Sequence, residues 1–216
     1  MTTPEADLKG IYLNMVSEAI ARLLSAQAYL AAYDITQTLP DIESAILQVR
    51  KSLEATAFAA IAPNKFAYES FRAKAEDQPD YRKDYHAGRI LHGLSEINKN
   101  FYPIALLPAT RKADGSWHFE RKMSGYLTKK RFETFYDRLG KHLHAHNPWS
   151  NNKNLQNIVS DMPNTIEEIF GLLEFHITFI QTPEFHGAWI VEAKRDGTPP
   201  RIITGTAEGE FIVEGN

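Results

Sequence analysis

The 216-residue chain contains no cysteine, and this absence excludes three kinds of chemistry. Without thiols the protein has no disulfide bond, no thiolate nucleophile and no zinc site ligated by cysteine. The chain also lacks any run of about 18 consecutive apolar residues, so we expect no membrane span. The first ten residues, MTTPEADLKG, lack the basic-then-apolar order of a secretory signal, and we therefore expect a cytoplasmic protein.

The composition that remains is ordinary for a globular protein, 43% hydrophobic and 24% charged, and the length allows a sizeable core. The net charge of −3 conceals an uneven distribution. Residues 111–141 carry nine Lys/Arg and four Asp/Glu, a net charge of +5, which leaves −8 for the remainder. A local positive potential attracts phosphates, although a solvated charged face is a commoner reason for such a segment.

Apolar residues at helical intervals indicate a mainly α fold. Two long helices are expected over residues 4–32 and 41–62, and their short connection makes them an antiparallel pair. The same patterns predict helices over 65–75, 84–101 and 128–146, and another that begins at Thr165. Thr128 is expected to cap its helix, and Thr165 has the spacing of a capping box with Glu168.

The C-terminal part differs in kind. Residues 187–195 and 200–206 have strand composition and flank Asp196-Gly197, a hairpin signal, while 210–214 predicts a further strand. Residues 175–181 combine helical spacing with strand composition.

We therefore predict an antiparallel helical bundle over residues 1–180. A small C-terminal β-hairpin or meander, residues 181–216, is expected to pack on the same domain. Between the helices, Asp114-Gly115 is typical of the turn of a short hairpin.

The helix expected over 128–146 ends in an unusual cluster, RLGKHLHAHNPW. With about 100° per residue, a buried stripe centred on Leu139 also contains Phe132, Phe135 and Leu143, with Tyr136 near its edge. His146 lies close to that stripe.

The polar residues of this helix divide between its other faces. Arg138 and His142 share one flank with Arg131, whereas His144 points elsewhere, near Glu133 and Asp137. Arg138 and His144 are about 120° apart on an unbroken helix.

Three interpretations of the cluster compete. His142 and His146 have the i, i+4 spacing of zinc-binding helices, but no acidic residue completes a zinc motif, and we predict no metal and no cofactor. Histidines at a helix C-terminus also interact favourably with the helix dipole without any further role. The third interpretation is phosphodiester chemistry, in which a histidine transfers protons and an arginine neutralises developing phosphate charge.

The segment Arg138-LGKHL-His144, late in a chain that begins with two long helices, resembles the Arg-x4–6-His motif of the HEPN superfamily. The stretches ESAILQVRKSLEATAFAAIAPNK and FYP…YLTKKRFETFYDRLGKHLHAHNPW are similar to uncharacterised bacterial HEPN-like proteins, and the resemblance spans about residues 10–180.

This resemblance implies a helical homodimer that cleaves RNA without metal, by attack of the RNA's own 2′-OH. It implies a catalytic pair in which Arg138 holds the phosphate and His144 transfers protons. The residues expected to contact the substrate are His142, His146, Asn147, Lys141 and Arg131. It further implies a bacterial defence or toxin protein with RNA as substrate and an antitoxin or defence protein as partner. The alternative is a non-catalytic HEPN-like module for protein interaction or RNA binding, with the C-terminal strands as a docking edge.

Several residues outside the motif carry weaker expectations. Arg50 and Glu54 are four apart and predict an ion pair within a helix. His86 and His92 match no ligand template. Aromatic residues that interleave with the basic segment, Phe119, Tyr126 and Tyr136, are able to stack RNA bases, although packing is the commoner role. The tryptophans, too, are expected to pack: Trp117, Trp149 and Trp189.

Overall fold

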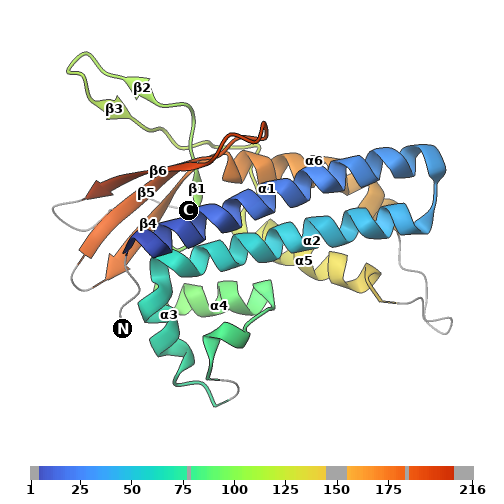
Figure 1. Ribbon diagram of the computed structural model, residues 1–216, viewed down its shortest axis with the longest axis horizontal. Coiled ribbons are helices and arrows are strands. Elements are labelled where there is room, and N and C mark those ends of the chain that lie inside the picture. The colour runs from blue at the N-terminus through green and yellow to red at the C-terminus, as the bar shows by residue number, and fades with distance from the viewer. Residues whose placement is uncertain (1–4, 77–78, 145–154, 183–184, 207–216) are drawn as a thin grey trace.

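A computed structural model describes residues 5–76, 79–144, 155–182 and 185–206 of the chain. Helices α1 (Glu5–Thr36) and α2 (Leu39–Ile61) lie antiparallel and form the long axis of the molecule (Figure 1). Gln37 connects them with a positive φ of 53°, and its backbone N–H donates to the carbonyl of Tyr33. The antiparallel pair that the sequence predicts is therefore confirmed.

Shorter helices pack beside α2. After the 3-10 turn η1 (Ala62–Asn64) come α3 (Lys65–Arg72), a second turn η2 (Tyr81–Lys83) and α4 (Ala87–Ile97). Helix α4 contacts both α2 and α5 (Lys129–His142), so the chain after α2 folds back along the helical pair (Figure 1).

The faces of α5 agree with the sequence pattern. Thr128 caps the helix, since its side-chain oxygen accepts a hydrogen bond from the N–H of Arg131. The buried side chains of α5 are those expected: Phe132, Phe135, Tyr136 and Leu139.

Helix α6 (Leu155–Leu173) contradicts the capping box, which is a wrong prediction. The helix begins at Leu155, and Thr165 is a buried residue within it whose hydroxyl donates to the carbonyl of Asp161. The upstream turns bury Ile158 and Met162 in the core, and this packing extends the helix past Pro163, which occupies an interior position.

Four strands form an antiparallel sheet in the order β1-β4-β5-β6. The sheet joins β1 (Ile104–Ala105) to the C-terminal strands β4 (Phe175–Thr182), β5 (Phe185–Glu192) and β6 (Arg201–Thr206). The ambiguous segment 175–181 is therefore a strand, and strands are confirmed within 187–195 and 200–206. The strand expected over 210–214 lies outside the described residues. The fold class is confirmed as mainly helical with a small antiparallel sheet.

Each face of the sheet has a different role. The inner face carries His176 and Trp189, both buried against Tyr12 of α1. On the outer face a row of paired isoleucines crosses all four strands: Ile104, Ile177, Ile190 and Ile203. Ile203, on the last strand, is 49% exposed.

A second, two-stranded hairpin projects from the body of the molecule (Figure 1). It consists of β2 (Thr110–Arg111) and β3 (Trp117–His118), and its turn contains Asp114-Gly115 as expected. Trp117 is 60% exposed, so the expectation that it packs is wrong, whereas Trp189 is buried. Trp149 lies outside the described residues.

Within the described ranges, no helix has the length and apolar content that a bilayer crossing requires.

Candidate functional site

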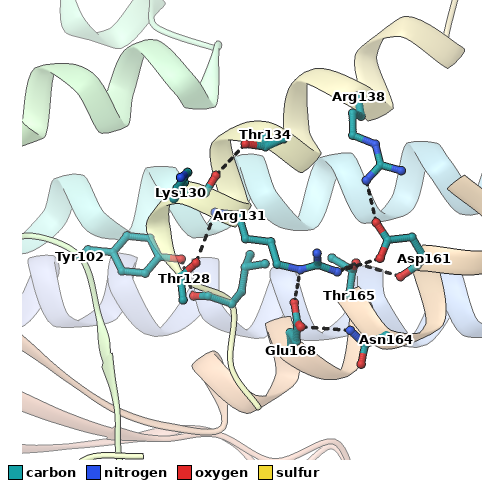
Figure 2. Close-up of polar contacts among 11 residues, drawn as sticks. Tyr102, Thr128, Lys130, Arg131, Thr134, Arg138, Asp161, Asn164, Thr165 and Glu168 are labelled. Atoms are coloured by element: carbon teal, nitrogen blue, oxygen red, sulfur yellow. Dashed lines mark hydrogen bonds and ion pairs between the residues drawn. The ribbon is translucent and has the colours of Figure 1, made fainter. Parts of the chain in front are cut away.

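Two of the predicted site residues, Arg131 and Arg138, join α5 to α6 through one carboxylate (Figure 2). Asp161 of α6 accepts from Nη2 of Arg131 through Oδ1 at 2.8 Å and from Nη1 of Arg138 through Oδ2 at 2.7 Å. Arg131 also donates to Glu168 and, at 2.9 Å, to the hydroxyl of Thr165. Both guanidinium groups are therefore already bound to acids within the chain.

The charge of Asp161 is stabilised by this arrangement. Burial alone would raise the pKa of its carboxyl, but hydrogen bonds from Arg131 and Arg138 lower the pKa below the usual value. The network thus cross-links the two helices electrostatically, and each arginine has a structural reason to be present.

The candidate catalytic histidine, His144, lines a different surface. It borders an open hollow of about 400 Å³ between α2, α4 and the end of α5, hereafter the α4–α5 hollow. Its lining residues are Arg50, His86, Asp137, Gly140, Lys141, Leu143 and His144. Asp137, near which His144 is expected, lines the same hollow.

Arg50 is held on the wall of this hollow by α5. Its guanidinium carbon lies 3.9 Å from the centre of the Tyr136 ring, and Nη2 donates to the Tyr136 hydroxyl at 2.6 Å. The predicted ion pair with Glu54 is confirmed, with Nε 3.2 Å from the carboxylate. Gly140 makes the approach possible, because a Cβ at that position would lie 2.6 Å from Nη1 of Arg50.

Tyr136 connects these groups. Its hydroxyl donates to Glu54 at 2.9 Å while it accepts from Arg50. Burial, followed by the hydrogen bond to Glu54 and the charge of that carboxylate, raises the pKa of Tyr136 to about 12, although Arg50 opposes the shift. The phenol is therefore neutral at physiological pH and serves to orient the arginine.

His86 enters the hollow from the start of α4. It is the N-cap of that helix: Nδ1 accepts from the N–H of Arg89 at 3.4 Å, which places the proton of the neutral ring on Nε2. The imidazole meets the Tyr136 ring edge to face, with centroids 5.2 Å apart. His86 therefore shares an aromatic support with Arg50.

A second hollow of about 570 Å³ adjoins the first between α3, α4 and α5. The two hollows share the lining residues His86 and Asp137. The second hollow adds further charged and titratable side chains: Arg72, Asp84, Arg89, His92 and Glu133.

The structure thus divides the predicted site. His144 and Lys141 line the hollow, whereas Arg131 and Arg138 bind Asp161 on α6. His142 is the last residue of α5. His146 and Asn147 lie outside the described residues, so the spacing of His142 and His146 as a zinc pair is not tested.

Sequence reasoning missed two residues of the hollow. The Arg50–Glu54 spacing identified an ion pair but gave no sign that α5 would pack against it. His86 had no recognisable motif, and only the fold brings its ring to α5.

Among the residues that the structure describes, no group of three or more His, Cys, Asp or Glu has an arrangement suited to a metal ion. The α4–α5 hollow combines two imidazoles, a guanidinium, an ammonium group and the carboxylate of Asp137. Imidazoles beside cations on one surface are suited to proton transfer at a phosphodiester.

Comparison with known proteins finds no match to this chain among family models, curated proteins or solved structures.

Proposed function

We propose that this protein is a metal-independent endoribonuclease whose reaction centre is the α4–α5 hollow. The observation that carries the proposal is the presence of two histidines, His144 after the end of α5 and His86 at the start of α4, on the wall that also holds Arg50 and Lys141. The proposal keeps His144 from the HEPN-like motif and gives the phosphate-binding role to Arg50 and Lys141 in place of Arg138.

The reaction requires only groups of this kind. One imidazole removes the proton of an RNA 2′-OH, whose oxygen then forms a bond to the adjacent phosphorus. The P–O5′ bond breaks, and the second imidazole, as its imidazolium, donates a proton to the departing oxygen. The products are a 2′,3′-cyclic phosphate and a 5′-hydroxyl. Arg50 and Lys141 offset the charge that develops on the phosphate oxygens.

The resemblance to HEPN proteins extends this proposal beyond one chain. In that family two protomers line a shared RNA cleft, so we propose a cytoplasmic homodimer of bacterial defence or toxin type, controlled by a partner protein. Light scattering of the purified protein tests the dimer, since a monomer at micromolar concentration contradicts it.

The decisive experiment measures RNA cleavage in EDTA. His144→Ala and His86→Asn should each lower the cleavage rate about 100-fold or more, because each removes a proton-transfer group. Asparagine is chosen at His86 because it retains helix capping. Lys74→Ala, at an exposed position after α3, is the control and should cleave like wild type.

Arg138→Ala separates the two site assignments. Cleavage that survives in Arg138→Ala and is lost in His86→Asn supports the hollow. The opposite result supports the pair Arg138/His144 that the motif implies. Unchanged cleavage in His144→Ala contradicts both.

A non-catalytic interaction or RNA-binding module is the second candidate. The observation that favours it is that the arginines near the motif are engaged with carboxylates: Arg138 with Asp161, and Arg50 with Glu54. This alternative would be established if the wild-type protein binds RNA but leaves it intact after incubation on the order of days at every pH between 5 and 9.

A further inference from the structure

The β2–β3 hairpin is built unlike the rest of the chain. It projects toward the end of the molecule opposite the C-terminal end of α5 (Figure 1). Every residue from Thr110 to His118 is exposed. The base of the hairpin is anchored, since Leu107 donates its N–H to the carbonyl of Glu120 at 2.8 Å and Lys122 donates to that of Ala105 at 2.9 Å.

The turn of the hairpin is ordered by local bonds. Gly115 has a φ of +85°, and Asp114 accepts from the N–H and the hydroxyl of Ser116 at 2.9 and 2.6 Å. A hairpin of this length gains little from burial, because a two-stranded ribbon alone is marginally stable in water. The anchored base and the ordered turn therefore hold the exposed side chains of the hairpin in a defined arrangement.

Trp117 is the most prominent of these side chains. The indole is 60% exposed, and its cross-strand partner in the register is Arg111, so the two side chains lie on the same face of the hairpin. Exposed tryptophan beside arginine is an arrangement suited to stacking a planar ring next to an anion.

Below the indole lies an open hollow of about 650 Å³, hereafter the hairpin hollow. Its apolar wall comes from the hairpin and from the outer edge of the sheet: Pro108, Ala109, Trp117, Phe119, Phe175 and Ile203. The rings of Phe119 and Phe175 are tilted by 44° with centroids 6.1 Å apart. The hollow is thus lined by aromatic and apolar surfaces that attract a flat ring system.

The charges around the hairpin hollow favour an anionic partner. Residues 110–122 contain four Lys/Arg and two Asp/Glu, a net charge of +2. At the rim, Glu192 is paired with Arg201 and Glu174 with Arg195. The charged residues that line the hollow at its rim, Glu174, Glu192, Lys194 and Arg201, carry no net charge, so the positive charge comes from the hairpin.

We propose that the β2–β3 hairpin is a binding arm for single-stranded RNA. An unpaired base stacks on Trp117 over the hairpin hollow, and the flanking phosphates follow Arg111, Lys112 and Lys194. The strand must be unpaired, because bases in a duplex are stacked on each other and offer no free face to an indole. The choice of RNA rests on the proposed function, and the arm would anchor a substrate at a distance from the α4–α5 hollow.

The test is the binding of a short labelled oligouridylate, followed by fluorescence anisotropy in EDTA. Trp117→Ala should weaken binding roughly tenfold, the effect of losing one stacked base, and Trp117→Phe should restore most of it. Lys112→Ala should lower the slope of log affinity against log salt by about 0.7, since it removes one phosphate contact on a single strand.

Matched variants exclude general effects on the fold. Tyr29→Ala removes a 39%-exposed aromatic side chain from α1, and Lys74→Ala removes an exposed lysine after α3; both should bind like wild type. Trp117→Ala should keep the melting temperature of wild type, because the indole is largely solvated in the folded protein.

Three results would overturn the arm: binding of Trp117→Ala equal to wild type, affinity independent of salt, or equal affinity for an RNA duplex of the same length. The outcome is separable from cleavage. A protein that binds through Trp117 but never cleaves RNA would sink the proposed nuclease while it leaves the arm intact.

Discussion

The guanidinium of Arg50 occupies the space beside Gly140 in which another residue would place its Cβ atom. A Cβ on Gly140 would lie 2.6 Å from Nη1 and 3.5 Å from Cζ of Arg50. The contact couples α5 to α2 and sets the position of the cation in the α4–α5 hollow.

Gly140→Ala should therefore destabilise the protein even though alanine is the better helix former by about 1 kcal/mol. The methyl group displaces Arg50 from Tyr136 and Glu54, and we expect a net loss of about 1–2 kcal/mol in the free energy of unfolding. In an Arg50→Ala background the sign should reverse, and Gly140→Ala should stabilise. Urea unfolding of the four proteins checks this, and destabilisation in both backgrounds would show that Arg50 is not the cause.

Two further helical glycines, Gly171 and Gly10, differ in how much space a Cβ atom would have. A Cβ on Gly171 of α6 would lie 2.1 Å from the carbonyl oxygen of Gly125, whereas Gly10 of α1 has nothing within 4 Å of such an atom. Gly171→Ala should cost about 3 kcal/mol or more, because backbone must move. Gly10→Ala should stabilise by about 1 kcal/mol through helix propensity. Thermal unfolding measures both, and equal effects would contradict the close approach at Gly171.

The buried imidazole of His176 predicts a pH dependence of stability. Nδ1 lies 3.0 Å from the carbonyl of Leu173, which can only accept, so Nε2 accepts from the Tyr12 hydroxyl at 2.7 Å and the ring is neutral. Burial lowers the pKa of His176 to about 4 from an ordinary 6.5, against the opposing hydrogen bond to Leu173. The unfolded chain therefore binds more protons between these values.

Stability from His176 should be complete above pH 6.5 and fall as the pH drops toward 4, by about 3 kcal/mol in total. His176→Gln should flatten this part of the profile, because glutamine keeps a donor and an acceptor but does not titrate. Urea unfolding from pH 7 to pH 4 provides the measurement. His118→Gln, at an exposed position, is the control, and an unchanged slope in His176→Gln would refute the assignment.

The carboxylate of Asp161 should affect the stability of the protein in a lower pH range than His176 does. Its pKa is lowered in the folded state, so the stability that it contributes is complete above about 4 and is lost as the pH falls further. Asp161→Asn should cost about 1–2 kcal/mol at neutral pH, a modest value because all three partners are partly exposed. Added salt should reduce the difference between Asp161→Asn and wild type; a difference that grows with salt would contradict an electrostatic origin.

Local signals in the sequence predicted what local physics determines. The apolar periodicity of α2 and α5, the cap at Thr128 and the turns at Asp114 and Asp196 all depend on neighbours within a few residues. The same reasoning separated Arg138 from His144 by helical geometry, and the structure agrees, since Arg138 binds Asp161 whereas His144 lines the α4–α5 hollow.

The features that the sequence did not predict depend on packing between segments far apart in the chain. Thr165 has every local feature of a cap, but Ile158 and Met162 gain more from burial than a helix start at Thr165 would save. The pairing of Ile104 with Ile177 and the approach of His86 to Tyr136 join segments that no local pattern connects. The exposure of Trp117 likewise depends on how far the hairpin extends from the body.

The contact between Tyr12 and His176 spans 164 residues, and this has a consequence during synthesis on the ribosome. The pair of α1 and α2 can form as soon as it emerges, yet the face that carries Tyr12 has neither its imidazole acceptor nor the ring of Trp189 until β4 and β5 are translated. The nascent helical pair therefore carries an uncovered apolar face through most of translation. A chaperone that shields that face would act on the unfinished chain rather than on the released protein.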